Sequence, residues 1–192
     1  NDSVYPGVRL DRTVIVTHLF VLDVFRAGSG DEHQVDWVMH GLGQVQDPAG
    51  CVPADLGQAR GYRHFRNARE WRPAGGRVAL TWRDKGMETS AQFAFPASAR
   101  LLLAEDPHPS EEKPELGELE MELLRSTVII RVRAKQTVFI SLWAFDPSPV
   151  AMPSLDVKAG RADEDVVLAT SSAGKTVTWR LPRAEGSVER MG

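Results

Sequence analysis

The sequence predicts an all-β fold, a two-layer antiparallel β-sandwich with roughly a dozen strands and little or no helix. Apolar and β-branched residues recur in short alternating or continuous runs, and clusters of Gly, Pro and Asp separate these runs. The sequence contains no long amphipathic helical pattern and no internal repeat. A single sheet with that many strands would leave one apolar face in water, so two packed sheets are expected.

The first part of the chain predicts three short antiparallel strands. Apolar side chains alternate along residues 13–17, and residues 20–26 form a denser apolar run. Residues 27–31, with the sequence Ala-Gly-Ser-Gly-Asp, are rich in the residue types that turns require. A hairpin closed there would return along residues 33–40. Its expected opposite pairs are Arg26–Glu32, Leu22–Asp36 and His18–His40.

The remaining strands follow at similar spacing. They are predicted at residues 60–66, 77–83, 88–95, 99–104, 119–124, 127–133, 137–145, 166–170 and 176–181. Residues 105–118 are acidic, contain three prolines and predict a loop or insertion. We therefore expect the sandwich to occupy residues 1–182 and residues 183–192 to form a flexible tail.

Composition excludes several classes of function. A net charge of −3 and a pI near 6.0, with the basic residues spread along the chain, argue against a nucleic-acid partner. No apolar run is long enough for a membrane helix, and the first residues lack the basic and apolar regions of a signal peptide. The single cysteine, Cys51, excludes an internal disulfide and has no basic neighbour that would activate it as a nucleophile.

Metal binding by His33, Asp36 and His40 is disfavoured by strand geometry. His33 and His40 are seven positions apart and face opposite sides of a regular strand. Asp36 and His40 share a face but lie about 13 Å apart at ~3.3 Å per residue. The sequence therefore predicts no metal site in this chain, and these residues are expected to form hydrogen bonds at the sheet surface.

A second set of polar residues fits the contact surface of a sugar. If residues 60–66 form a strand, Tyr62, His64 and Arg66 share one face, and His40 adds a further acid or base. The middle of the chain is locally positive, which is compatible with an acidic sugar. Its arginines are Arg60, Arg63, Arg66, Arg69, Arg72 and Arg77. A solvent-exposed strand face is the alternative explanation.

The tryptophans divide into core and surface candidates. Trp37 and Trp82 alternate with apolar residues and are expected in the core, whereas the pattern around Trp143 leaves its place open. Trp71 is predicted to lie in a loop, where it is free to stack on a sugar ring. Asp23, inside an apolar run, is expected to pair with an arginine such as Arg12.

Several short motifs occur in order between residues 5 and 147. They are Tyr5-Pro6-Gly7-Val8, Arg12-Thr13, residues 21–25, His33 with Asp36-Trp37, His40-Gly41, Gly61-Tyr62, Asn67-Ala68-Arg69, Trp82 and residues 129–147. Together they resemble the C-terminal β-sandwich region of heparinase II/III-like polysaccharide lyases, a group that includes the oligo-alginate lyases. The fold implied by this resemblance is a sandwich of the super-sandwich type.

The resemblance implies that the chemistry lies outside this chain. In that family the catalytic Tyr and His lie on an α-helical toroid domain, and a further His and a zinc site lie early in the sandwich. All of these would precede Asn1, and the chain has no His-Asn pair that matches the family motif. No catalytic residue and no cofactor is therefore assigned here, and zinc would belong to the missing part.

The function implied by the resemblance is that of a supporting portion of an enzyme. The complete lyase would cleave a uronic-acid-containing polysaccharide by β-elimination in the periplasm or outside the cell. This chain would support the missing N-terminal helical catalytic domain, form one wall of the cleft and be inactive alone. His40, Tyr62, His64, Arg66 and Trp71 are the residues expected to contact the substrate. The alternative is a stand-alone carbohydrate-binding or structural sandwich without catalysis.

Overall fold

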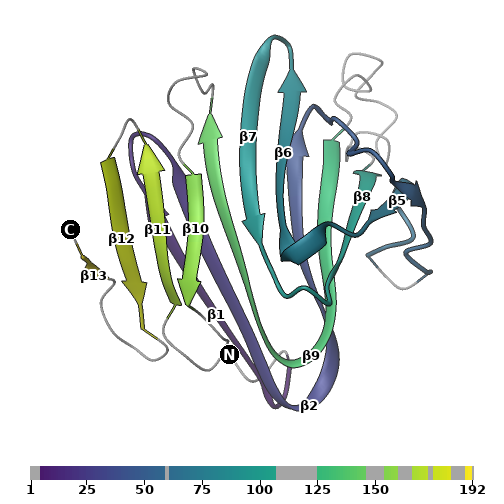
Figure 1. Ribbon diagram of the computed structural model, residues 1–192. Helices are drawn as coiled ribbons and strands as arrows, with labels where there is room; N and C mark the ends of the chain where they lie inside the picture. Colours follow the sequence, from purple (N-terminus) through teal and green to yellow (C-terminus); the bar gives the residue numbers. More distant parts are fainter. Residues whose placement is uncertain are drawn as a thin grey trace, which may run out of the picture.

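The computed structural model describes residues 5–58, 61–106, 125–145, 154–159, 166–172, 175–182 and 189–191, which form two sheets of antiparallel strand pairs (Figure 1). Sheet A contains β1 (Val8–Val16), β2 (Val21–Leu42), β3 (Gln44–Val45), β4 (Val52–Pro53), β5 (Arg66–Trp71), β6 (Arg77–Asp84), β7 (Met87–Ala94), β8 (Arg100–Asp106) and β9 (Arg125–Phe145). Sheet B contains β10 (Ser154–Ala159), β11 (Val166–Ser172), β12 (Lys175–Leu181) and β13 (Glu189–Arg190). The predicted all-β class is confirmed, with one 3₁₀ turn, η1 (Ala74–Gly76), in the described part.

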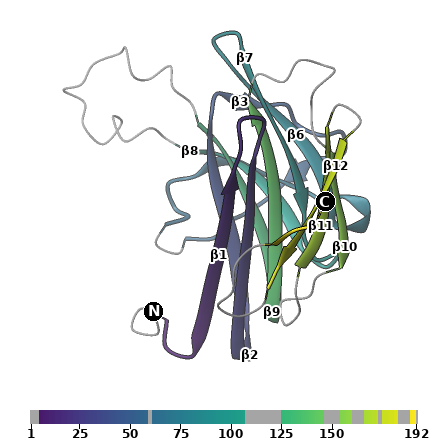
Figure 2. The ribbon, with the colours of Figure 1, turned by 90° about the vertical axis from the view of Figure 1, so that its left-hand side faces the viewer.

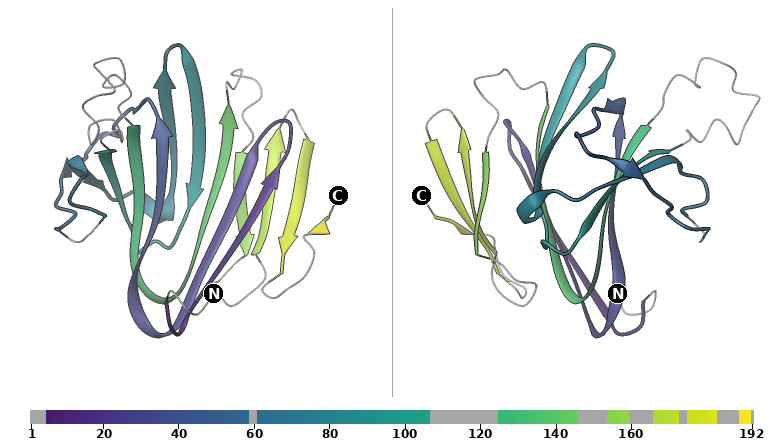
Figure 3. Two further views of the ribbon diagram at one scale, coloured as in Figure 1. Left: turned by 180° about the vertical axis from the view of Figure 1, so that it is seen from behind. Right: turned by 45° about the vertical axis from the view of Figure 1, so that its right-hand side comes forward.

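Two long strands, β2 and β9, fold sheet A back on itself. They pair from Val21 opposite Trp143 to Leu42 opposite Arg125, and their register shifts between Gly28 and His33. Both strands curve together at the end of the molecule opposite the β6–β7 turn (Figures 1 and 3). One half of the sheet contains β1, β6 and β7, and the other contains β8, β5 and β4.

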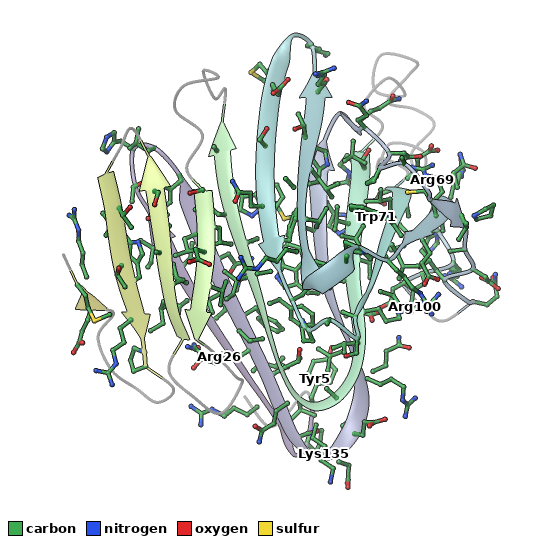
Figure 4. All side chains as sticks on the ribbon, viewed as in Figure 1. Tyr5, Arg26, Arg69, Trp71, Arg100 and Lys135 are labelled. Atoms are coloured by element: carbon green, nitrogen blue, oxygen red, sulfur yellow. The ribbon has the colours of Figure 1, made fainter. Side chains whose placement is uncertain are left out.

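The predicted hairpin at residues 27–31 is therefore wrong. The two arms of β2 do not pair with each other there, because β9 bends alongside and pairs with β2 on either side of residues 29–32. Lys135, on β9, lies at the bend in Figure 4. The register expected from a hairpin is also wrong, since Leu22 pairs with Leu142 and Asp36 pairs with Arg131.

Other strand boundaries differ from the prediction. The predicted strands at 127–133 and 137–145 are one strand, β9, and β10 was not predicted. The predicted strand at 60–66 is wrong, because residues 61–64 form a turn and the strand β5 begins at Arg66. Residues 107–124, which include the predicted strand at 119–124 and most of the predicted loop, lie outside the described residues. Of the predicted tail, Glu189–Arg190 pair with β12 as β13, and residues 183–188 are not described.

The main core fills the space between the two halves of sheet A. It is rich in aromatic rings, and Trp82 and Trp143 have centroids 5.2 Å apart. Trp37 packs edge-on against Phe93 at 5.7 Å. The prediction that Trp37 and Trp82 are core residues is confirmed, and Trp143 is buried with them. Burying each such side chain contributes about 1.5–3 kcal/mol to folding.

Sheet B covers the outer face of the first half. Leu22 and Leu142, which point away from the main core, pack with Leu168 and Leu181 of sheet B. The buried Arg26 donates from Nη2 to the backbone carbonyl of Leu181 at 3.0 Å. Figure 4 labels Arg26 beside sheet B. The protein thus has a third layer, held by apolar packing and a buried arginine.

The strand β1 lies along the edge of sheet A beside the first half of β2 (Figure 2). Arg12 on β1 donates from Nε and Nη2 to the two carboxylate oxygens of Asp23, each at 2.9 Å. The predicted partnership of these two residues is confirmed. Because Asp23 is almost fully buried, Arg12 supplies the charge that its carboxylate requires.

We predict that Gly41→Ala destabilises the protein by about 1–3 kcal/mol because of overpacking. A Cβ at this position would overlap the buried indole of Trp82, which packs directly on the glycine. Gly30→Ala is the matched control, since a Cβ there meets nothing within 4 Å. Urea unfolding of both variants measures the effect. Equal stability of the two variants would contradict the packing described here.

Candidate functional site

Polar side chains meet on the outer face of the second half of sheet A, on the side opposite the main core. Paired residues across neighbouring strands share a face, so the register decides which residues meet. Asp36 of β2 is opposite Arg131 of β9, which is opposite Arg100 of β8. His40 is opposite Thr127 in the same way. We call the residues Asp36, His40, Tyr62, Asp106, Arg125, Thr127 and Arg131 the outer-face cluster.

One part of the cluster is a buried ion pair with a tyrosine. Arg131 donates to the Asp36 carboxylate from Nε at 2.9 Å and from Nη2 at 2.8 Å. The two side chains are only 11% and 7% exposed. The Tyr62 hydroxyl donates to the same carboxylate, and the Arg131 guanidinium lies 5.1 Å from the centre of the Tyr62 ring. These contacts hold the turn that contains Tyr62 against the sheet.

The environment of Tyr62 makes it a poor acid at neutral pH. Burial, followed by the hydrogen bond to the negative Asp36, raises the pKa of Tyr62 to about 12 from its ordinary value of 10.0, against an opposing effect of Arg131. The phenol therefore stays protonated and continues to donate to Asp36. It is suited to holding the turn in place more than to abstracting a proton.

The other part of the cluster is centred on His40. Its Nδ1 lies 2.9 Å from Oδ2 of Asp106 and 3.0 Å from the hydroxyl of Thr127. Arg125 donates from Nη2 to the same Asp106 oxygen at 2.7 Å. A carboxylate can only accept, so the Nδ1 of His40 carries the proton and Nε2 is left as an acceptor in the neutral ring.

His40 is the accessible member of the cluster. Its side chain is 43% exposed, whereas that of Asp106 is 12% exposed. Within the described part of the chain, Nε2 has no hydrogen-bond partner. An oriented imidazole with an accessible Nε2 can accept a proton or bind a hydroxyl group.

A covering segment, residues 54–58 and 61–65, brings His40 and Tyr62 together. Its apolar side chains pack on a small second core formed by Leu56, Leu102, Ala104 and Ile129. The Phe65 ring lies between the two residues, with centroids 6.1 Å from His40 and 6.2 Å from Tyr62. The two predicted contact residues therefore share one surface, although they come from a strand and a turn.

The other predicted contact residues are placed differently from the expectation. Residues 61–64 form a turn, so Tyr62, His64 and Arg66 do not share one strand face, and that prediction is wrong. His64 is exposed and accepts from Nε of Arg63 at 3.1 Å. Arg66 is exposed at the start of β5. Their contact with a substrate stays a prediction.

The prediction that Trp71 lies in a loop is wrong. Trp71 is the last residue of β5, pairs with Leu101 and packs partly buried against the main core. It lies beside β8 in Figure 4. Because its neighbour Glu70 faces the other side of the sheet, with Leu102, Trp71 points away from the outer-face cluster.

The residues that support His40 and Tyr62 were not predicted from the sequence. Asp106 belongs to residues 105–118, for which the sequence predicts a loop. In the structure, β8 extends through the preceding apolar run as far as Asp106. Arg131 alternates with apolar residues along β9, a pattern that indicates one polar face but not its partner. Only the pairing of β2 with β9 identifies Asp36 as that partner.

Arg100 of β8 lies opposite Arg131 and belongs to a neighbouring network of ion pairs. Arg100 forms a short ion pair with Glu70, and Arg72 donates to Glu70 from Nε at 2.7 Å. The Arg100 hydrogen bond is the largest cause that lowers the pKa of Glu70 to about 2 from its ordinary value of 4.5. Each of the two facing arginines thus has its own carboxylate.

Among the described residues, no group of three His, Cys, Asp or Glu side chains lies close enough to hold a metal ion. The carboxylate of Asp36 is already bound by Arg131, and that of Asp106 by Arg125 and His40. In the same part of the chain, no helix is long and apolar enough to cross a membrane.

The fold is similar to part of three solved lyase structures. They are a heparinase III with methylated lysines, at 11% identity, and the heparan sulfate lyase HepC from Pedobacter heparinus in mutant and unmutated forms, at 16% and 14% identity. Each has a TM-score of 0.55, and 95–97% of this chain is covered. The chain spans only about a quarter of the length of these lyases, with 24–26% of each covered.

No family model and no curated protein matches the sequence. At 11–16% identity, the structural similarity shows a shared fold. The resemblance to the heparinase-type lyases is confirmed as a likeness of this fold over nearly the whole chain.

We predict that Asp36→Asn destabilises the protein by about 3–5 kcal/mol, because the buried guanidinium of Arg131 loses its counter-charge. The control is Glu32→Gln, which removes the carboxylate of the exposed Arg133–Glu32 pair and should cost at most about 1 kcal/mol. Thermal unfolding compares the two. A smaller loss of stability for Asp36→Asn than for Glu32→Gln would show that the buried pair does not stabilise the fold.

We predict that the stabilising effect of Glu70 depends on pH. Its pKa is depressed in the folded state, so its ionic contribution is present above the ordinary pKa of 4.5 and is lost as the pH falls toward about 2. The difference in unfolding temperature between the wild type and Glu70→Gln should be largest at neutral pH. It should shrink as the pH falls from 4.5 toward about 2. A difference that does not change with pH would contradict the ion pair with Arg100.

Proposed function

We propose that this chain is the sandwich portion of a polysaccharide lyase that cleaves a uronic-acid-containing polymer by β-elimination. In this proposal the chain supports a helical catalytic domain and forms one wall of the cleft. The observation that carries it is the similarity of nearly the whole chain to part of heparinase III and heparan sulfate lyase structures. Heparan sulfate, named in two of these structures, is an acidic polysaccharide.

The outer-face cluster is the proposed wall of the cleft. β-elimination of a uronate requires a base for the C5 proton, an acid at the glycosidic oxygen and a group that neutralises the carboxylate. His40 is the only member of the cluster with an accessible, oriented nitrogen in the described structure. It is the residue that we propose binds a sugar hydroxyl.

The other members of the cluster are poorly suited to the chemistry. Tyr62 has a pKa of about 12 and donates its proton to Asp36, so it does not readily become a base. The charges of Arg131 and Arg125 are balanced by Asp36 and Asp106. The chain alone is therefore proposed to be inactive, and the catalytic groups are assigned to the helical domain.

Exposed apolar residues on β1 favour a supporting role. Leu10, Val14 and Val16 alternate along one face of this edge strand and are 44%, 49% and 72% exposed. An apolar row of this kind on an edge strand is typical of a surface that another domain covers. The second candidate function, a stand-alone carbohydrate-binding module, rests on the accessible His40 and does not account for this row.

The proposed partners and location follow from the proposed activity. The substrate is an acidic polysaccharide, and the enzyme acts in the periplasm or outside the cell, where such polymers are met. His64 and Arg66, both exposed near the covering segment, stay as further proposed contacts with the acidic chain.

Ultraviolet absorbance of the unsaturated uronate product tests this proposal. We expect no product from this chain alone and product from the full-length gene product, with heparan sulfate and alginate as substrates. In the full-length protein, His40→Gln should lower kcat/KM about tenfold through the loss of one hydrogen bond.

The matched control is His33→Gln, an exposed histidine of the same strand that lies outside the outer-face cluster. It should leave kcat/KM unchanged. Product formation by this chain alone would overturn the assignment of the catalytic groups to another domain.

A further inference from the structure

The apolar row on β1 lies on the core side of sheet A. Val16 pairs with Val21 of β2, which in turn lies opposite the core residue Trp143. Val14 and Leu10 share this face of β1, because side chains alternate along a strand. All three residues of the row are exposed, so the core side of β1 is open to solvent in the described structure.

A mostly apolar cavity of about 290 Å³ adjoins this row. Its lining includes Val14 of β1, Met39 and Gly41 of β2, and the rings of Trp82 and Trp143. Protein interiors are normally close packed, with few voids larger than a water molecule. The main core is therefore incompletely filled between β1 and the second half of β2.

The second half of β2 is an edge strand. Residues 33–42 pair with β9 on one side, and β1 pairs only with residues 21–29. Among the described residues, no strand pairs with the other edge of residues 33–42. This stretch contains no proline, and its register with β9 is regular, so neither device that commonly protects an edge strand is present. Its outward backbone N–H and C=O groups can therefore accept an additional strand.

Strand geometry connects this free edge with the apolar row. In the first half of sheet A, β1 lies on the side of β2 away from β9, and the free edge of residues 33–42 points to the same side in the second half. β1 and the second half of β2 diverge from the shared bend (Figure 3). A strand added to the free edge would lie about 4.8 Å beyond β2 and extend the second half over the core side of β1.

Such a strand would satisfy both open surfaces at once. Its inward side chains would meet the cavity and Val14, and its outward side chains would lie beside Asp36 and His40 of the outer-face cluster. A helix could cover the apolar row, but its backbone groups are already paired and could not bond to residues 33–42.

We propose that a β-strand from the rest of the full-length protein pairs with residues 33–42 of β2 and covers Leu10 and Val14. The strand alternates apolar and polar side chains, with the apolar ones facing the cavity. Its origin in the same polypeptide rests on the proposed function, and the lyases that share this fold are about four times as long, since the chain covers 24–26% of them. The free edge, the apolar row and the cavity do not depend on that function.

Hydrogen–deuterium exchange of peptides from residues 33–42 tests the pairing, measured by mass spectrometry in this chain alone and in the full-length protein. The amides that point away from β9 should exchange about tenfold more slowly in the full-length protein, because each gains a hydrogen bond. Equal exchange in the two proteins would overturn the proposal. Protection that arises in this chain alone as its concentration rises would identify a second copy as the occupant and would also overturn it.

A lysine substitution tests whether the same strand covers the apolar row. Val14 is about half exposed, so Val14→Lys should leave the exchange of this chain alone unchanged. In the full-length protein the added strand would bury this lysine without a counter-charge, so residues 33–42 should exchange as fast as in this chain alone.

Met87→Lys is the matched control. Met87 is an exposed apolar residue at the start of β7 that does not line the cavity, and its substitution should change exchange in neither protein. Retained protection in full-length Val14→Lys, or equal loss of protection in both variants, would contradict the proposal.

Lyase activity of the full-length protein is measured separately. Protection of residues 33–42 without product would overturn the proposed activity and support the added strand. Product without protection would support the activity and overturn the added strand.

Discussion

The pairing of β2 with β9 on both sides of a shared bend is the constraint on which the rest of the structure depends. Because both strands bend together, the backbone hydrogen bonds are kept on either side of Gly28 and His33, and one sheet supplies both layers around the main core. The bend also creates two outer faces. Sheet B covers one, and the covering segment, residues 54–58 and 61–65, covers part of the other, where the outer-face cluster lies.

Ion pairs with a buried carboxylate specify the register of β1, β2 and β9. Asp36 lies opposite Arg131, and Asp23 lies next to Arg12 across the β1–β2 pair. A slip of one residue would turn these charges toward the opposite face of the sheet and separate them from their partners. Such pairs add little net stability, but a buried charge that loses its partner is strongly destabilising. The pairs therefore select one strand register among those that apolar packing alone would allow.

The candidate site combines a rigid strand with a turn held by side chains. His40 is fixed by β2 and by Asp106 and Thr127, whereas Tyr62 is held against the sheet by Asp36 and Arg131. The side chains of such a surface are held in fixed positions by their neighbours. Its charges are largely balanced within the chain, which is why the proposal gives it a supporting role and assigns the chemistry to another domain.

The sequence by itself determined the all-β class, most strand positions, the core tryptophans Trp37 and Trp82 and the pairing of Arg12 with Asp23, because alternation and buried charge are local properties. It also identified His40 and Tyr62 as residues of interest. The tertiary structure alone decided that residues 27–31 form a bend. Glycine and serine permit either a bend or a turn, and the neighbouring strand selects between them. Asp106, Arg125 and Arg131 became part of the site for the same reason, since their partners are distant in sequence and only strand register brings them together.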